Sequence, residues 1–317
     1  MKKKIVHALT DLIGHTPMLH PANYSQANHL QGILFLKMES FNPSGSVKDR
    51  AAFALIESAE QKGLIHKDSI LVESTSGNTG IGLAFVAASK GYRLLLTMPD
   101  TMSVERQNLL KALGAELILT PGAQGMKGAI AQADELVSTM EHAIRLKQFV
   151  DPANPSIHER TTAFEIWEAT QGEVDVIVAG IGTGGTISGI GRGLKALNSN
   201  IEVIGVEPVD SPVITTGKAG PHKIQGIGAG FIPDNYHAEV VDRVETVTFD
   251  QAVSASRMLA KKEGLLAGIS SGAAVAVATE LARQEAYKDK KIVVILPDTG
   301  ERYLSTLLYA YEAYPLD

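Results

Sequence analysis

Short apolar runs alternate with longer amphipathic stretches along most of the chain. The glycines that follow several of the longer stretches are typical helix ends. This alternation is typical of βαβ units, and it predicts an α/β protein with parallel-rich twisted sheets flanked by helices. The apolar runs predict strands at 33–38, 69–74, 92–98, 115–120, 175–180, 201–207 and 291–297. The amphipathic stretches predict helices at 47–61, 80–90, 104–114, 126–137, 158–170 and 251–264.

The rhythm of strands and helices changes at the proline-rich turn DPANPSIHE, residues 151–159. We therefore expect two domains: a smaller mobile one at 46–152, and a larger one formed by 1–45 and 153–317. Because ligands bind at the carboxyl ends of parallel strands, the active site is expected in the cleft between the two domains.

Composition narrows the function classes. The chain of 317 residues carries a net charge of −6, which favours neither nucleic acid nor an anionic membrane as a partner. No apolar run reaches the roughly 18 residues of a membrane span, so a cytoplasmic protein is expected. The absence of cysteine excludes disulfides, thiol catalysis and Cys-ligated metals, and the histidines lack HExxH spacing, so no metal site is predicted.

The glycine run AGIGTGGTISG follows a predicted strand and precedes a helical stretch. Backbone N–H groups at such a helix start form a site for a phosphate. Gly180, Gly182 and Gly185 also fit GxGxxG, and the next strand ends at Glu207, where a ribose-binding acid would lie. The run therefore leaves an NAD-dependent dehydrogenase open. The candidate phosphate ligands are Gly182, Thr183, Gly184, Gly185 and Thr186.

A lysine opens the helix after FNPSGSV. Ser46 is a candidate N-cap, and Lys48 stands in the first turn, where the helix dipole favours negative charge. A positive field stabilises the neutral amine, which is the form that makes a Schiff base or accepts a proton. The alternative is an ordinary solvated lysine.

Two further loops carry polar side chains at helix starts. Within ESTSGNTG, the predicted carboxylate pocket consists of Thr75, Ser76, Gly77, Asn78 and Thr79. Ser270 and Ser271 in GISSGA precede an apolar helix, where a simple cap and a functional role are equally good interpretations. A phosphate cradle, a reactive lysine and a carboxylate pocket together fit pyridoxal phosphate better than they fit NAD.

The ordered motifs NPSGSVKDR, TSGNTG, GIGTGGT, PHKIQGIGAGFIP, GISSGA and GERYLST resemble those of the O-acetylserine sulfhydrylase (cysteine synthase) family of fold-type II pyridoxal-phosphate enzymes. The resemblance runs from Thr10 to Thr306. It implies β-replacement of O-acetyl-L-serine by sulfide, through an α-aminoacrylate intermediate, to give L-cysteine and acetate. It also implies a homodimer and, as a partner, the C-terminal tail of serine acetyltransferase.

The resemblance also implies residue roles. Lys48 would carry the cofactor as an aldimine and act as the catalytic base, and Ser270 would bond the pyridine nitrogen. Gly182–Thr186 would hold the phosphate. Asn78 would contact the ring oxygen, and Gly226–Gly230 would line the mouth of the site. The implied substrate ligands are Thr75, Ser76, Gly77, Asn78, Thr79, Gln148 and Gly228.

A cystathionine β-synthase-type enzyme that uses homocysteine shares these motifs, so the acceptor stays open. A serine or threonine dehydratase agrees less well with GIGAGFIP and GERYLST. Two positions depart from the family pattern. Ala163-Phe164 replaces a glycine–proline pair, which predicts an altered helix start, and Asp298 stands where many relatives carry serine.

Overall fold

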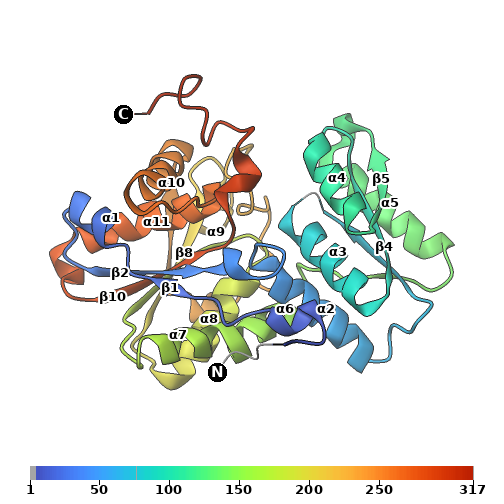
Figure 1. Cartoon of the computed structure of the whole chain (residues 1–317), viewed down its shortest axis with the longest axis horizontal. Helices are drawn as coiled ribbons and strands as arrows, with labels where there is room; N and C mark the ends of the chain where they lie inside the picture. Colours follow the sequence, from blue (N-terminus) through green and yellow to red (C-terminus); the bar gives the residue numbers. More distant parts are fainter. Residues whose placement is uncertain (1–4, 76, 317) are drawn as a thin grey trace. The chain divides into compact units, whose positions relative to one another are not determined.

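The computed structural model describes residues 5–75 and 77–316. The chain forms two compact units, whose elements are labelled in Figure 1. Unit 1 takes the N-terminal segment up to Ile13 together with Asn42–Asn154. Unit 2 takes Gly14–Phe41 and the segment from Pro155 onward. Each unit contains its own sheet.

Unit 1 is built on a four-stranded parallel sheet in the order β5-β4-β3-β6. Its strands are β3 (Ile70–Ser74), β4 (Arg93–Pro99), β5 (Glu116–Thr120) and β6 (Ala143–Arg145). Its helices are α2 (Lys48–Gln61), α3 (Asn78–Lys90), α4 (Val104–Ala112) and α5 (Gly125–Thr139), with 3-10 turns at Leu9–Leu12 and Gly122–Gln124.

Both faces of this sheet are covered, because successive side chains of a strand point to opposite faces. On β3, Leu71 packs with α2 and α3, whereas Val72 packs with Ala133 of α5. On β4, Leu94 and Leu95 divide in the same way. A strand buried on both faces reads as a continuous apolar run, which is why the sequence revealed these strands.

Unit 2 contains a six-stranded sheet in the order β1-β2-β10-β7-β8-β9, in which only the β1–β2 pair is antiparallel. The strands are β1 (Met18–Leu19), β2 (Ile33–Met38), β7 (Val176–Gly180), β8 (Glu202–Pro208), β9 (Arg243–Val247) and β10 (Lys291–Leu296). The helices are α1 (Ala22–Ala27), α7 (Ala163–Ala169), α8 (Gly185–Leu197), α9 (Val213–Thr216), α10 (Phe249–Glu263) and α11 (Ile269–Ala282). Helix α6 (Ala153–Ile157) stands at the junction of the two units.

Side-chain alternation again assigns the helices to faces. Val176 and Val178 of β7 pack with α10 and α11, which lie together in Figure 1. Ile177 and Ala179 of the same strand pack with α7 and α8. The alternation therefore gives unit 2 two cores, one on each face of its sheet.

Helix α8 meets its neighbours backbone to backbone. A Cβ at Gly189 would lie 2.1 Å from the carbonyl oxygen of Pro155, and one at Gly193 would lie 2.6 Å from the Cβ of Ala163. The facing segment is a π-helix, His158–Thr162, which continues directly into α7. Helix α7, which begins at Ala163, therefore continues a segment that is already helical, and the effect of the Ala163-Phe164 pair stays a prediction.

The predicted strands are confirmed, each with ends within one residue of the expected bounds. Strands β1, β6 and β9 were not predicted. The helix ends at Gly91 and Gly264 are confirmed, since both residues cap their helices in the left-handed conformation, with φ of 79° and 67°. Over residues 5–75 and 77–316, no helix combines the length and hydrophobicity of a membrane span. The same residues contain no cluster of three His, Cys, Asp or Glu side chains suited to a metal.

Candidate active site

Lys48 is the first residue of α2, as the sequence predicted. Val47, the residue before it, already has helical φ and ψ. The Ser46 hydroxyl accepts a hydrogen bond from the Lys48 N–H at 3.3 Å, as a capping side chain does. The fully buried carboxylate of Asp49 accepts hydrogen bonds from the backbone N–H of Ser44, at 2.6 Å, and from its hydroxyl. These bonds hold the loop before Lys48 in one conformation, so the position of the Lys48 backbone is fixed.

The start of α3 lies against the start of α2. A Cβ added to Gly82 would lie 2.9 Å from the carbonyl oxygen of Lys48, so only glycine allows the two helices to approach so closely. In the loop before α3, the buried Thr75 hydroxyl accepts a hydrogen bond from the Gly77 N–H at 3.3 Å. Asn78 is the first residue of α3. The structure therefore places the backbone of Lys48 against α3, about one turn after the predicted carboxylate loop, within unit 1. Ser76, also predicted there, lies outside the described residues.

Gln148 joins this loop from the segment after β6. Its side-chain oxygen accepts a hydrogen bond from the Thr79 hydroxyl at 2.6 Å, and both side chains are buried. The side-chain amide of Asn154 donates to the Gln148 carbonyl oxygen at 2.9 Å. Loops that follow two neighbouring parallel strands thus meet at the carboxyl edge of the sheet.

A buried ion pair that the sequence analysis missed lies just before the carboxylate loop. Glu73, at the end of β3, is 2% exposed, and its Oε1 accepts hydrogen bonds from the Ser74 N–H at 3.0 Å and from Arg145 Nη2 at 3.3 Å. Desolvation by burial raises the pKa of Glu73, while the Arg145 guanidinium and the Ser74 and Gln148 amides act in the opposite direction. A single glutamate in the run ILVES gives no sign of such a partner.

In unit 2, the glycine run forms the turn between β7 and α8. Gly184 caps α8 in the left-handed conformation, with φ of +81°, and a Cβ there would lie 2.6 Å from the backbone nitrogen of Tyr236. A Cβ on Gly182 would lie 2.4 Å from the carbonyl oxygen of Gly226. Glycine is therefore required at both positions for the turn to pack against its neighbours and lead into α8, whose first N–H groups are of the kind that binds an anion. Thr183 is buried, and the Thr186 hydroxyl lies 3.3 Å from His158 Nε2.

The loop 226–230 lies between the glycine run and Ser270. The Gly228 N–H donates to the Ile181 carbonyl oxygen at 2.9 Å, and the His222 Nε2–H donates to the Gly228 carbonyl oxygen at 2.9 Å. On its other side, a Cβ at Gly226 would lie 3.4 Å from the Ser270 hydroxyl oxygen. Ser270, at the start of α11, is 2% exposed. The predicted phosphate loop, mouth loop and pyridine ligand are thus neighbours within unit 2.

Asp298 has a structural partner close to the start of α11. Its Oδ2 accepts a hydrogen bond from the Tyr303 hydroxyl at 2.6 Å, and its carbonyl oxygen accepts one from Gly268 N–H. A Cβ added to Gly268, the cap of α11, would overlap the Asp298 carboxylate. The aspartate thus fills space at the helix start that precedes Ser270.

Glu207 does not behave as a ribose-binding acid. It is buried, and its carboxylate accepts hydrogen bonds from the backbone N–H groups of Ile214 and Thr215, at 2.9 and 3.0 Å. The Thr215 hydroxyl adds a third bond at 2.6 Å. Because both oxygens of the carboxylate are used within the fold, the GxGxxG run lacks the acid of a dinucleotide site.

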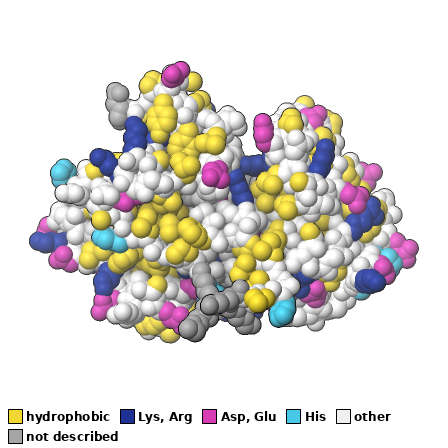
Figure 2. Space-filling view, viewed as in Figure 1, with side chains coloured by type: hydrophobic (Ala, Val, Ile, Leu, Met, Phe, Trp, Pro, Cys, Tyr) yellow, Lys and Arg dark blue, Asp and Glu magenta, His cyan; other side chains and the backbone are white. Residues whose placement is uncertain are grey.

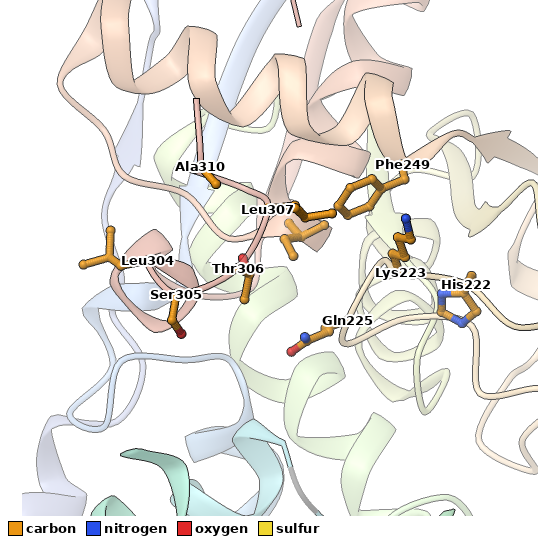
Figure 3. A pocket seen from close by; sticks show the side chains of 10 residues that line it. His222, Lys223, Gln225, Phe249, Leu304, Ser305, Thr306, Leu307 and Ala310 are labelled. Atoms are coloured by element: carbon orange, nitrogen blue, oxygen red, sulfur yellow. The ribbon is translucent and has the colours of Figure 1, made fainter. Parts of the chain in front are cut away.

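A cavity of about 530 Å³ adjoins this half of the site in unit 2 (Figure 3). Figure 3 shows Phe249 and Leu307 on one side of it and Gln225 on the other. The Lys223 ammonium lies 5.7 Å from the centre of the Phe249 ring. The residues that line the cavity are His222, Lys223, Gln225, Phe249, Ile269, Leu304, Ser305, Thr306, Leu307 and Ala310.

The residues present fit pyridoxal phosphate. The phosphate needs N–H donors at a helix start, and the glycine run provides them at the start of α8, where Gly182 and Gly184 pack against the backbone of Gly226 and Tyr236 too closely for any side chain. The cofactor needs a primary amine, which Lys48 supplies at a fixed helix start. It also needs a partner for its ring nitrogen, and the buried Ser270 hydroxyl is of the right chemistry.

Comparisons with known proteins agree with this chemistry. Cysteine synthase A of Escherichia coli is 54% identical over 308 residues, which is 94% of each chain. A solved cysteine synthase (OASS) from Entamoeba histolytica superposes with a TM-score of 0.95 at 42% identity, covering 98% of this chain and 92% of its own.

A second solved structure extends the range of relatives. A hydrogen sulfide-producing enzyme from Fusobacterium nucleatum gives a TM-score of 0.90 at 43% identity, covering 95% of this chain and all of its own. The family described as pyridoxal-phosphate dependent enzyme matches residues 9–298. The chain therefore belongs to the pyridoxal-phosphate dependent enzymes, and its fold is that of the fold-type II members.

Proposed function

We propose that this protein is a cysteine synthase, which replaces the acetate group of O-acetyl-L-serine with sulfide and releases L-cysteine and acetate. The observation that carries the proposal is the close packing of α2 and α3 near their starts, where the Lys48 carbonyl oxygen leaves no room for a Cβ on Gly82. This packing brings the residue that bears the proposed amine close to the helix that follows the predicted carboxylate loop. The identity of 54% to cysteine synthase A of Escherichia coli supports the same reaction.

We propose that both units serve one cofactor molecule, as the sequence predicted for a site between two domains. Gly182–Thr186 would hold its phosphate, Ser270 its ring nitrogen and Asn78 its ring oxygen. When bound, pyridoxal phosphate supplies an electron sink for the bond electrons released at the substrate's α-carbon.

The protein's own side chains direct the reaction. The loop 75–79 and Gln148 bind the substrate carboxylate through hydroxyl, amide and helix N-terminal N–H groups. Lys48 removes the proton from the α-carbon as the β-carbon–oxygen bond breaks and acetate leaves. Hydrosulfide then forms the new bond at the β-carbon, and Lys48 returns the proton to the α-carbon. Gly228 and its neighbours line the mouth through which the acceptor enters.

The test is a visible absorption spectrum of the purified, cofactor-loaded protein during stepwise addition of substrates. We expect the cofactor band to move to longer wavelength with O-acetyl-L-serine and to return with sulfide as cysteine accumulates. A band that ignores sulfide and returns with homocysteine would identify a cystathionine-forming enzyme instead. A protein that stays colourless after incubation with pyridoxal phosphate would overturn the proposal.

We further propose a homodimer, the state implied by the family resemblance. Large hydrophobic side chains exposed on unit 2, among them Phe164, Phe231 and Ile232, support it. Figure 2 shows hydrophobic side chains exposed on one face of the molecule. Light scattering after gel filtration tests the mass of the assembly.

A peptide from the C-terminal tail of serine acetyltransferase is a second proposed partner, tested by its inhibition of turnover. A cytoplasmic location remains a prediction, and cell fractionation tests it.

A further inference from the structure

The carboxylate loop of unit 1 is connected to a buried ion pair that none of the roles above uses. Glu73 is the residue before Ser74, at the end of β3, and Arg145 ends the neighbouring strand β6. The side chain of Glu73 is 3% exposed and that of Arg145 is 14% exposed. Charged groups are rarely buried to this extent without a purpose, because desolvation costs more than a plain ion pair returns.

The pair holds the two chain segments that form the loop. On the β3 side, Arg145 Nη2 donates to the Ser74 hydroxyl at 3.3 Å, and the Glu73 carboxylate accepts the Ser74 N–H. On the β6 side, the backbone amide of Gln148 acts to lower the pKa of the same carboxylate, against the larger effect of burial. The Gln148 side chain in turn accepts the hydrogen bond of the Thr79 hydroxyl. Glu73 and Arg145 therefore both bond Ser74, the residue just before the loop, and they join β3 to β6, the strand that leads to Gln148.

The charges of the pair also matter for the ligand that the loop is proposed to bind. A carboxylate buried beside this loop would repel a substrate carboxylate if nothing offset its charge. Arg145 supplies the offsetting charge at 3.3 Å, and Asp134 of α5 pairs with Arg145 from the exposed side. Glu73, the carboxylate buried nearest the loop, thus has a guanidinium in direct contact with it.

We propose that Glu73 and Arg145 are positioning residues of the substrate-carboxylate loop. They hold β3 and β6 in register beside the loop, and Arg145 offsets the buried charge of Glu73. The inference rests on the proposed function, since it assigns the pair to the binding of the O-acetyl-L-serine carboxylate. Neither side chain touches the reacting atoms in this account.

The test compares KM for O-acetyl-L-serine in the cofactor-loaded wild type, Arg145→Leu, and the double variant Glu73→Gln/Arg145→Leu. Arg145→Leu removes the partner of the buried Glu73 carboxylate. If Glu73 stays charged, it repels the substrate carboxylate; if it takes up a proton, it accepts a weaker hydrogen bond from the Ser74 N–H. We expect KM to rise roughly tenfold, as for one lost charge-assisted hydrogen bond. We expect kcat to stay within about twofold, because the loop binds ground and transition states alike.

The double variant separates positioning from general damage. It removes both charges and keeps an acceptor oxygen for the Ser74 N–H, so KM should return to within about threefold of the wild type. Arg93→Leu is the matched control, because Arg93 pairs with Glu116 on the same sheet with about half of each side chain exposed, and its loss should leave KM unchanged. Thermal melts of all variants check folding.

Two results would overturn the inference: a wild-type KM in folded Arg145→Leu, or a raised KM that the double variant does not restore. If Arg145→Leu does not fold, Arg145→Lys takes its place. Lysine keeps the positive charge but cannot bond Glu73 and Ser74 with a planar guanidinium, so a wild-type KM in Arg145→Lys would also overturn the inference. Failure of the proposed function is distinct, because the wild type itself would then not consume O-acetyl-L-serine.

Discussion

The two units present binding groups of opposite kinds. Unit 1 offers side chains: an amine at Lys48, and hydroxyls and amides at Thr75, Asn78, Thr79 and Gln148. Unit 2 offers mainly backbone, because Gly182, Gly184 and Gly226 have no room for a Cβ or sit tightly against a neighbour. A substitution in a site made of side chains can remove or move a single polar atom. In a site made of glycine backbone, any substitution adds a Cβ that the neighbouring backbone does not accommodate.

The difference matches the two proposed tasks. A phosphate is the same in every turnover, so an invariant cradle of N–H groups suits it. A substrate must enter, react and leave, and side chains on short hydrogen bonds can hold it and release it. Variants of unit 1 should therefore change rate or KM, and variants of unit 2 should change cofactor affinity and stability.

The largest expected effect is that of Lys48→Ala. Turnover of O-acetyl-L-serine should fall by about three orders of magnitude or more, because no other amine replaces the proposed base. Cofactor phosphate should still bind in unit 2, so pyridoxal phosphate should remain with the protein through desalting. Turnover near the wild-type rate, measured as cysteine formed, would contradict the role of Lys48.

Gly184→Ala should break the backbone site. The new Cβ would meet the Tyr236 nitrogen at 2.6 Å in a left-handed conformation, so we expect a loss of about 2–4 kcal/mol in unfolding free energy. Cofactor affinity should fall at least about tenfold. Gly217→Ala is the matched control, since φ is +74° but nothing lies within 4 Å; it should cost about 1 kcal/mol and leave cofactor affinity unchanged. Urea unfolding and absorbance titration check both, and equal effects would refute the cradle.

Thr79→Val tests whether a side chain of unit 1 affects substrate binding without affecting cofactor binding. It removes the hydroxyl that donates to Gln148 at 2.6 Å, so KM for O-acetyl-L-serine should rise roughly tenfold with cofactor affinity unchanged. Thr79→Ser should recover most of the loss. Thr279→Val removes a buried threonine hydroxyl that bonds Tyr24 in unit 2, and should lower stability without changing KM. An unchanged KM in Thr79→Val would remove this residue from the pocket.

The smallest expected effect concerns alkaline pH in unit 2. Burial raises the pKa of Tyr309 to about 12, and its hydroxyl donates to the Ala267 carbonyl oxygen at 3.0 Å. Since the folded pKa exceeds the unfolded value of about 10, the neutral hydroxyl stabilises the protein fully below about pH 10 and progressively less up to about pH 12. Tyr309→Phe should cost about 1 kcal/mol at pH 7 and lose less stability than the wild type between pH 9 and 11. Parallel losses in urea unfolding would contradict this assignment.

Most of the fold could be predicted because buried parallel strands leave continuous apolar runs. The strands that escaped prediction lack them. Strand β6 is three residues long and includes Arg145, and β9, RVETV, is a partly exposed edge strand. Their place is decided by pairing with β3 and β8, which is tertiary information.

The candidate site divides in the same way. Lys48 and the glycine run were predictable because helix starts and glycine turns are local features. The role of Gln148 came from the family resemblance alone, since nothing local directs a glutamine toward Thr79. Glu73 and Arg145 were not found, because an ion pair 72 residues apart in the chain exists only after β3 and β6 have paired.

The glycines of α8 have a consequence for protein engineering. Gly189 and Gly193 pack this helix directly on residues 155–163, so the direction of its N-terminus is set by contacts about one and two turns away from the proposed phosphate site. Grafting the glycine run alone onto another scaffold would transfer the N–H groups but not the contacts that set their direction. A functional graft would have to include α8 together with the π-helical segment on which it packs.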